Sequence, residues 1–244
     1  MKQMKKILAG MLCFLMVFLL VDQAYAVQKD TITDNGKVTI KSSSSKTDHW
    51  LAYKAKRTGI VTIKTTAKKC KVTLCNAKKK AITGSANFGK SVANAKSYSF
   101  AVKKGQIYYL KLNFPSKTTF TCKFAGLSSS GGNDYRSADM LKLNEKKEGL
   151  ACNSKICKYY RIDVDVMSYQ PIVFSVKTPK NSSSGFTFNL VNAVDLPLMA
   201  DMKLSGTQSY TFQNTLGPGT YYIIVKSNSK KTTGQYTITY GAQD

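Results

Sequence analysis

The sequence predicts an all-β protein: two tandem antiparallel β-sandwich domains of the jelly-roll type, following a signal peptide. Three observations carry this prediction. After residue 26 the chain reads as short apolar or alternating segments separated by Gly, Ser, Asn or Lys turns. No window keeps a convincing helical period for longer than two turns. One long stretch of sequence also occurs twice, which indicates two copies of a domain rather than a solenoid.

The repeat is clearest in two aromatic segments of each copy. The offset between matching residues drifts between 112 and 116 positions, as small loop insertions produce. The two copies should therefore superpose. The equivalent positions include Tyr98 with Tyr210, Tyr109 with Tyr222, Leu74 with Leu190, and residues 63–65 with 176–178.

Residues 1–26 are predicted to be a signal peptide. Lys2, Lys5 and Lys6 precede an apolar run, and Ala24-Tyr25-Ala26 has the small-x-small pattern of a signal-peptidase site. We expect a secreted, extracellular protein, with retention at the cell surface left open and no transmembrane segment in the mature chain. The expected parts are a basic β-sandwich domain at 27–126, a linker at 127–133 and a second β-sandwich domain at 134–244.

The expected strands follow from alternation and turn residues. Glycines in the turns at Gly105 and Gly219 sit between matching strands of the two copies. Residues 134–149 are the best helical candidate, and a weak one. The expected strands are 38–40, 50–55, 60–65, 71–75, 97–102, 106–113 and 118–124 in the first copy, and 159–166, 172–177, 186–191, 209–212, 220–226 and 235–240 in the second.

The same alternation predicts which side chains form the two cores. Tyr109 and Tyr222 fall on the opposite strand face from these residues, where we expect partial exposure. The predicted core residues are Ile63, Leu74, Leu110, Leu112, Phe120 and Phe124 in the first copy, and Ile162, Val164, Phe188, Leu190 and Tyr240 in the second.

Charge divides the two copies sharply. Residues 27–126 hold 21 basic and 3 acidic residues, whereas residues 127–244 hold 13 basic and 9 acidic residues. A net charge of +18 on one small domain attracts polyanions over a long range. Because the same fold carries only +4 in its second copy, the fold itself does not require this charge.

Five cysteines follow the signal peptide, so at least one of them lacks a partner within the chain. Cys70 and Cys122 lie in core register, where they act as small core residues or form a bridge. Cys152 and Cys157 flank a short loop and are a second candidate pair. Zinc is disfavoured, because spacings of five are wrong for zinc knuckles and His49 is the only histidine.

Certain residues resemble a known family. Each copy has an aromatic strand near its start (Trp50-Leu51-Ala52-Tyr53; Tyr159-Tyr160-Arg161-Ile162), an Asn turn (residues 76–80 and 192–195), and a late strand with paired tyrosines followed by an alternating strand. Over about residues 46–126 and 155–241 the chain is similar to the bacterial pre-peptidase C-terminal domain. The resemblance implies a small β-sandwich of the kind attached to secreted hydrolases. The chain departs from it in lacking a catalytic domain, and its first copy lacks the acidic residues that calcium-binding relatives use.

No catalytic constellation is evident, and we expect no enzymatic activity. His49 has no nucleophile elbow to serve, which favours a surface or packing role. Asp163 and Asp165 alternate with apolar residues on one expected strand. They are read as an ordinary solvent-facing pair, with calcium in the second domain as the one cofactor left open and a glycosidase pair as a further alternative.

The lysines are the preferred functional residues. Lys68, Lys69 and Lys71 precede or begin one short strand, and Lys78, Lys79 and Lys80 follow it, so the two clusters are expected to converge at its ends. The partner is expected to be an anionic glycan, teichoic acid or an extracellular protein. Nucleic acid is disfavoured, because no base-stacking motif is present. The sequence thus predicts a secreted, non-enzymatic binding or adhesion protein; the alternatives are an accessory or inhibitory subunit of a secreted hydrolase, and a hydrolase with an unrecognised site.

Overall fold

A computed structural model describes residues 30–41, 48–179 and 184–241. Over these residues the regular elements are all β-strands, arranged in two four-stranded and two five-stranded sheets. This confirms the predicted fold class of two antiparallel β-sandwiches, whereas the predicted signal peptide lies outside the described residues. Nowhere in the described ranges is there a helix with the length and apolarity needed to cross a bilayer.

The strands of the described chain divide into two groups, which we call the first half (residues 30–126) and the second half (residues 127–241). The first half contains β1 (Asp30–Thr31), β2 (Lys37–Ile40), β3 (His49–Lys54), β4 (Gly59–Thr65), β5 (Cys70–Cys75), β6 (Ala86–Phe88), β7 (Tyr98–Val102), β8 (Ile107–Asn113) and β9 (Thr118–Gly126). The second half contains β10 (Asp139–Met140), β11 (Glu145–Cys152), β12 (Cys157–Val164), β13 (Ile172–Lys177), β14 (Gly185–Asn192), β15 (Met202–Ser205), β16 (Thr207–Phe212), β17 (Gly219–Ser227) and β18 (Thr233–Tyr240).

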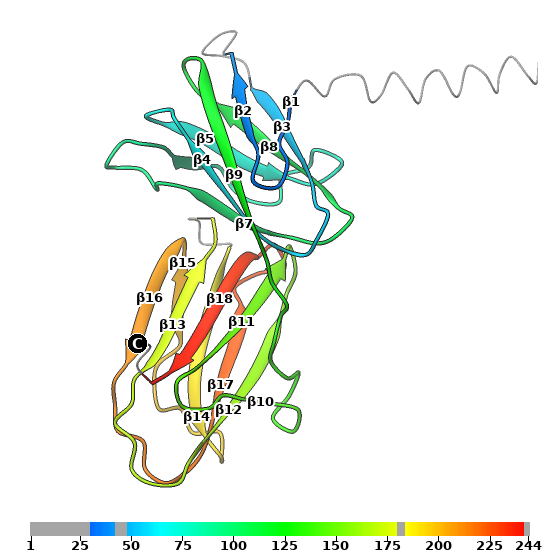
Figure 1. The fold of residues 1–244 in the computed structure, drawn as a ribbon. Coiled ribbons are helices and arrows are strands. Elements are labelled where there is room, and N and C mark those ends of the chain that lie inside the picture. Colours follow the sequence, from blue (N-terminus) through cyan, green and yellow to red (C-terminus); the bar gives the residue numbers. More distant parts are fainter. Residues whose placement is uncertain (1–29, 42–47, 180–183, 242–244) are drawn as a thin grey trace, which may run out of the picture.

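The two halves have the same sheet topology. The first half pairs its strands in the orders β1-β3-β8-β5-β6 and β2-β9-β4-β7, and the second half in the orders β10-β12-β17-β14-β15 and β11-β18-β13-β16. Each order in the second half is the first-half order with every strand number raised by nine. Figure 1 shows the halves stacked one above the other, with β7 and β18 near the junction. The exact domain boundaries at 126 and 134 stay a prediction.

The strand registers agree with the equivalences that the repeat predicts. Leu110 at the centre of β8 pairs with Leu51 on one side and Leu74 on the other. In the second half, Ile223 pairs with Tyr160 and Leu190. Leu74 and Leu190 therefore occupy the same register position. So do the preceding residues of the two central strands, Tyr109 and Tyr222.

One predicted match is displaced by two residues. Ile63 pairs with Tyr98 and Phe174 pairs with Tyr210. If Tyr98 and Tyr210 are equivalent, the partner of Ile63 in the repeat is Phe174, so the match of residues 63–65 with 176–178 is wrong. The error arises because a shift of two residues keeps every side chain on its own strand face, and the apolar pattern then looks the same.

Each half encloses its own core between its two sheets. Ten of the eleven predicted core residues are buried, with at most 6% of their surface exposed. Phe124 is the exception: it is half-buried, and the Arg57 guanidinium lies 4.8 Å from the centre of its ring. Phe124 packs at the margin of the first core, where a basic side chain covers its outer surface.

The helix weakly predicted over residues 134–149 is not formed. β10 and the first part of β11 occupy this stretch, and β11 pairs with β18 from Glu145 to Cys152. Between them Asn144 adopts a positive φ of 61°, which a helix does not accommodate. The continuous ladder with β18 satisfies the backbone of β11, and this outweighs a weak helical pattern.

The two halves contact each other through β7 and the adjoining ends of β11 and β18. The Thr233 hydroxyl accepts a hydrogen bond from the Ala101 N–H at 3.0 Å and donates one to the Ala101 carbonyl at 3.1 Å. Ile60, Ala101 and Leu150 form a small buried cluster there, with Leu127 packed against it. The expected linker is also bonded to the second half, since Ser130 N–H donates to the Glu148 carbonyl at 2.9 Å.

All five described cysteines are free thiols, so neither candidate bridge is formed in this structure. Cys70 and Cys122 lie in the core of the first half, as the small-core-residue alternative requires. Burial raises the pKa of the Cys70 and Cys122 thiols to about 12 in each case. Burial also raises the pKa of Cys152 to about 11. At neutral pH these groups are therefore protonated and poorly nucleophilic.

We predict that Leu110→Ala lowers the free energy of unfolding by about 2–5 kcal/mol, because it leaves a cavity in the centre of the first core. Leu143→Ala is the matched control, since Leu143 is 53% exposed. It should change stability by no more than about 0.5 kcal/mol. Denaturant unfolding of both variants measures this. Equal small losses would show that the inner and outer strand faces are assigned wrongly.

We predict five titratable thiols in a chain that starts at Val27 when it is unfolded in guanidinium. In the folded protein at pH 8, Cys70, Cys75 and Cys122 should stay unreactive, because they are buried and their pKa values are raised. An Ellman titration with and without denaturant counts both populations. A count of three thiols in the unfolded chain would indicate one bridge, and mass spectrometry would locate it.

Candidate functional site

The outer face of the five-stranded sheet in the first half carries the predicted lysine clusters. Strand alternation turns Leu51, Leu110 and Leu74 into the core and leaves their neighbours on the opposite face. Three rows cross this outer face from strand to strand, about 7 Å apart along each strand. The rows are Asn113, Lys71 and Asn87; then Trp50, Lys111 and Thr73; then Ala52, Tyr109 and Cys75.

A hollow of about 520 Å³ lies at the first of these rows. Lys69 and Lys71 line it, together with the amides of Asn87 and Asn113 and with Ser85. Both lysines are exposed. Ammonium groups supply positive charge, and amide and hydroxyl groups both donate and accept hydrogen bonds. The hollow can therefore bind an anionic group with hydroxyls beside it.

The second lysine cluster lies on a tight loop after β5. The Asn76 side-chain oxygen accepts hydrogen bonds from the N–H groups of Lys78 and Lys80, each at 3.0 Å. Lys79 between them adopts a positive φ of 57°. This turn fixes the backbone from which the Lys79 side chain extends, and its hydrogen bonds explain why Asn stands at position 76.

Lys79 reaches back over an aromatic pair on the sheet. Its Nζ lies 5.0 Å from the centre of the Trp50 ring and 5.5 Å from that of Tyr109. The two rings meet edge to face at 6.2 Å. Trp50 is half-buried. Tyr109 is buried, with 9% of its surface exposed, so the partial exposure expected for it is wrong, whereas Tyr222 is half-buried as expected. Ring faces and a nearby cation together suit a planar or ring-shaped anionic group.

The structure thus brings together some of the predicted site residues and separates others. Lys69 and Lys71 share the hollow, while Lys79 lies at the other end of β5, about 13 Å along the sheet. The two clusters therefore do not converge at one point, and that expectation is wrong; they occupy two ends of one face. Lys111 lies between them and pairs with Asp48 at 2.8 Å. Lys68, Lys78 and Lys80 are exposed beside these groups.

The two aspartates suggested for calcium do not share a strand face. β12 ends at Val164, so Asp165 follows it in a bend. The Arg161 guanidinium donates two hydrogen bonds to the Asp163 carboxylate, at 2.8 and 2.7 Å, and holds the pKa of that carboxyl below its usual value. In the described ranges no three His, Cys, Asp or Glu side chains gather as a metal site. Calcium binding stays a prediction.

His49 takes part in packing. Its ring lies 4.9 Å from that of Phe114, at the start of β3. Its neighbours on the strand, Asp48 and Trp50, belong to the outer face described above, where Asp48 is bound to Lys111. This arrangement fits the packing role expected from the sequence.

We call the pair Trp50 and Tyr109 the aromatic platform of the first half. The second half has an equivalent pair, which is covered by a third ring. By register, Tyr159 and Tyr222 stand where the first half has Trp50 and Tyr109. The Tyr135 ring packs on both, at 4.9 Å from each, and its hydroxyl donates a hydrogen bond to Asp195. An internal side chain therefore covers the platform of the second half.

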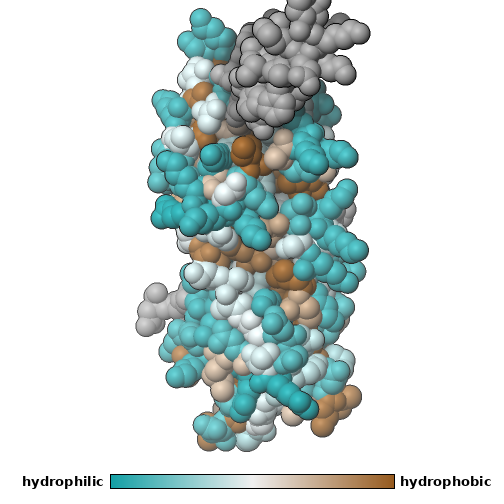
Figure 2. All heavy atoms as spheres, turned by 90° about the vertical axis from the view of Figure 1, so that its right-hand side faces the viewer, coloured by the Kyte–Doolittle hydropathy of each residue, from teal (hydrophilic) through white to brown (hydrophobic). Residues whose placement is uncertain are grey.

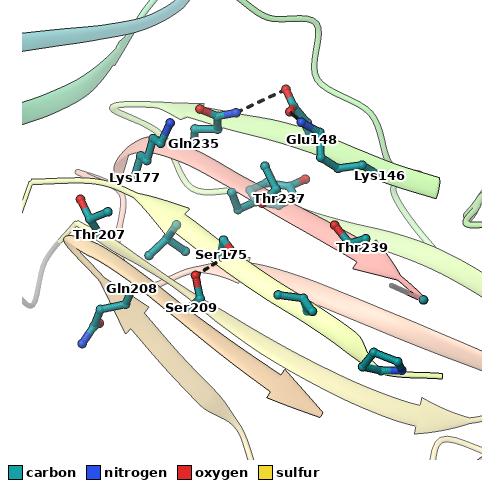
Figure 3. A pocket seen from close by; sticks show the side chains of 15 residues that line it. Lys146, Glu148, Ser175, Lys177, Thr207, Gln208, Ser209, Gln235, Thr237 and Thr239 are labelled. Atoms are coloured by element: carbon teal, nitrogen blue, oxygen red, sulfur yellow. Dashed lines mark hydrogen bonds and ion pairs between the residues drawn. The ribbon is translucent and has the colours of Figure 1, made fainter. Parts of the chain in front are cut away.

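A second hollow of about 520 Å³ lies on the outer face of the four-stranded sheet in the second half. Figure 3 shows Ser175 and Ser209 facing each other across β13 and β16, with their hydroxyls 2.9 Å apart. At the other side Gln235 donates to Glu148 at 3.3 Å, and Glu148 is paired with Lys146 at 2.6 Å. Lys146 and Glu148 neutralise each other, so Lys177 supplies the one remaining charge, and the hydroxyl and amide groups suit a hydroxyl-bearing ligand of low charge.

Surface hydropathy distinguishes the two ends of the molecule. In Figure 2 hydrophilic residues cover most of the upper part, while hydrophobic residues gather near mid-height and at the lower end. In the second half, exposed apolar residues occur in the loops that follow β12 and β14. They include Val166, Met167, Tyr169, Val194 and Leu196.

Sequence reasoning missed Trp50, Tyr109, Asn87 and Asn113 as site residues. Trp50 and Tyr109 are far apart in the chain and become neighbours only because β3 pairs with β8. Their one sequence signal was alternation, which places both on the face opposite the core. Asn87 and Asn113 flank Lys71 through two further strand pairs, which no local pattern reveals.

Comparisons with known proteins give only remote similarities. No protein-family model matches the chain, and no curated protein matches it either. A solved pre-peptidase C-terminal domain of collagenase from Bacillus anthracis is 17% identical, with a TM-score of 0.32, over 48% of this chain and 99% of that one. A tandem CBM22 domain of Xyn10C from Paenibacillus barcinonensis is 8% identical, with a TM-score of 0.23, over 85% and 86% of the two chains. Similarities at this level say nothing about function, so the function is inferred below from the geometry of the chain itself.

Proposed function

We propose that this protein is a secreted, non-enzymatic binding protein whose first half holds an anionic polymer on the outer face of its five-stranded sheet. The observation that supports this most directly is the hollow lined by Lys69, Lys71, Asn87 and Asn113. It combines two exposed ammonium groups with amide groups, which is the chemistry that an anionic, hydroxyl-bearing chain requires.

The difference between the halves supports the same proposal. Both have one topology, yet residues 27–126 carry a net charge of +18 and residues 127–244 one of +4. In the second half Arg161 on the equivalent face is paired with Asp163, and Tyr135 covers the aromatic platform. The polymer is then a cell-wall or host glycan, or a teichoic acid. The second half would bind a neutral glycan or an extracellular protein in the hollow around Ser175 and Ser209.

An accessory or inhibitory role toward a secreted hydrolase is the second candidate. It would act by protein contacts, for which the exposed apolar loops around Met167 and Leu196 are the favouring observation. Salt separates the two candidates, because polyanion binding weakens steeply as salt rises while apolar contacts do not.

We predict that replacing Lys69 and Lys71 by Gln weakens binding to heparin. The slope of the logarithm of the binding constant against the logarithm of the salt concentration should become shallower by about one per lost contact, by analogy with polyanionic nucleic acid. Replacing Lys78, Lys79 and Lys80 should act in the same direction, since they stand at the other end of the face. Titrations of the whole chain at two salt concentrations measure both effects.

The matched control is Lys103→Gln with Lys104→Gln. Both residues are exposed, and they lie on the turn between β7 and β8, away from the hollow. This double variant should keep most of the affinity. If it loses as much as the Lys69 and Lys71 variant, binding follows net charge alone and no localised site exists. If the unaltered chain binds no polyanion at either salt concentration, the proposed function is wrong.

A further inference from the structure

The internal repeat supplies a direct comparison for the aromatic platform of the first half. Trp50 and Tyr109 occupy the register positions of Tyr159 and Tyr222. The loop beside each platform is also built alike. Asn192 accepts hydrogen bonds from the N–H groups of residues 194 and 196, at 3.1 and 2.9 Å, as Asn76 does from residues 78 and 80.

The residue that each loop directs at its platform differs in charge. Lys79 and Asp195 are both three positions after the turn asparagine, with φ values of 57° and 64°. Asp195 accepts a hydrogen bond from the hydroxyl of Tyr135. Tyr135 lies on the second platform with its ring 4.9 Å from both tyrosines. The second half therefore shows a six-membered ring held between two aromatic side chains and one loop residue.

In the first half, within the described residues, no third ring contacts Trp50 or Tyr109; the Lys79 ammonium stands over them instead. Lysine has a flexible stem and a cationic head, so it can swing aside and pair with an anion without any change in the backbone. The position that binds a neutral phenol in one half is thus built for a ring carrying a negative charge in the other.

We propose that Trp50, Tyr109 and Lys79 bind a sugar ring that carries a carboxylate or sulfate group, as one unit of an acidic glycan. The ring packs against the two aromatic side chains, as Tyr135 does in the second half, and its anionic group pairs with Lys79. This rests on the proposed function and narrows its ligand from any anionic polymer to one with acidic sugar rings. Lys69 and Lys71 lie about 13 Å further along the same face, where they can pair with a second charged unit of the same polymer. A glycan is therefore favoured over a single sulfated tyrosine.

The test uses the fluorescence of Trp50, the only tryptophan of the chain. The whole protein is titrated with a heparin-derived hexasaccharide and, separately, with inorganic polyphosphate, which is anionic but has no rings. The hexasaccharide should shift the Trp50 emission in a saturable way. Polyphosphate should bind, as seen by calorimetry, while leaving that emission nearly unchanged.

Lys79→Gln is the decisive variant, and Lys104→Gln, an exposed residue on the turn between β7 and β8, is its control. Lys79→Gln should weaken hexasaccharide binding roughly tenfold, as loss of a charge-assisted contact implies, and polyphosphate binding by less than about twofold. Lys104→Gln should change both only slightly. Circular dichroism of each variant establishes that the fold is intact.

Three outcomes overturn the inference. Equal losses for the two ligands, or an unchanged Trp50 emission with bound hexasaccharide, remove the ring site while polyanion binding itself survives. A sulfated-tyrosine peptide that shifts the emission when the hexasaccharide does not replaces the glycan by a protein ligand. Failure of both polyanions to bind is a different result, since it removes the proposed function from which this inference starts.

Discussion

The alternation of side chains along β8 is the constraint on which the rest of the structure depends. Leu110 lies between Leu51 and Leu74 at the centre of the first core, and all three are fully buried. Once that residue points inward, Tyr109 and Lys111 must point outward, because consecutive residues of a strand face opposite sides. The face proposed to bind the ligand is therefore set by the core beneath it. A slip of one residue would exchange the two faces completely.

The two halves show that one sheet topology can carry two different outer faces. Both halves keep the sheet orders, the asparagine turn and an aromatic residue at the position of Tyr109. They differ in the side chains on the outer face. The first half has Lys79 and an open hollow, and the second half has Asp195 and the covering Tyr135. Core positions carry the stability of both halves, whereas the outer face is free to change charge and ligand.

Sequence reasoning predicted most strands and ten core residues because alternation is a local signal. It failed where the answer depends on contacts between distant segments. Phe124 reads as a core residue, yet it lies at a margin under Arg57. The match of residues 63–65 was displaced because a two-residue shift is invisible to face polarity. The lysines named from the sequence lie along one face of the first half, and their role in binding stays a prediction. The distances between the lysine clusters and the aromatic residues beside them follow from the order of the strands in the sheet, and no local sequence pattern predicts that order.

The Thr233 hydroxyl covers part of the free edge of a sheet. β7 is the outermost strand of its sheet, and Ala101 on it turns both its N–H and its carbonyl away from β4. An uncovered edge of this kind is a template for pairing with strands of other molecules. A single hydroxyl from the second half occupies both groups, and the Tyr108 hydroxyl accepts from Lys103 further along. The neighbouring half thus serves as a cap that keeps this sheet edge from pairing with the strands of another molecule.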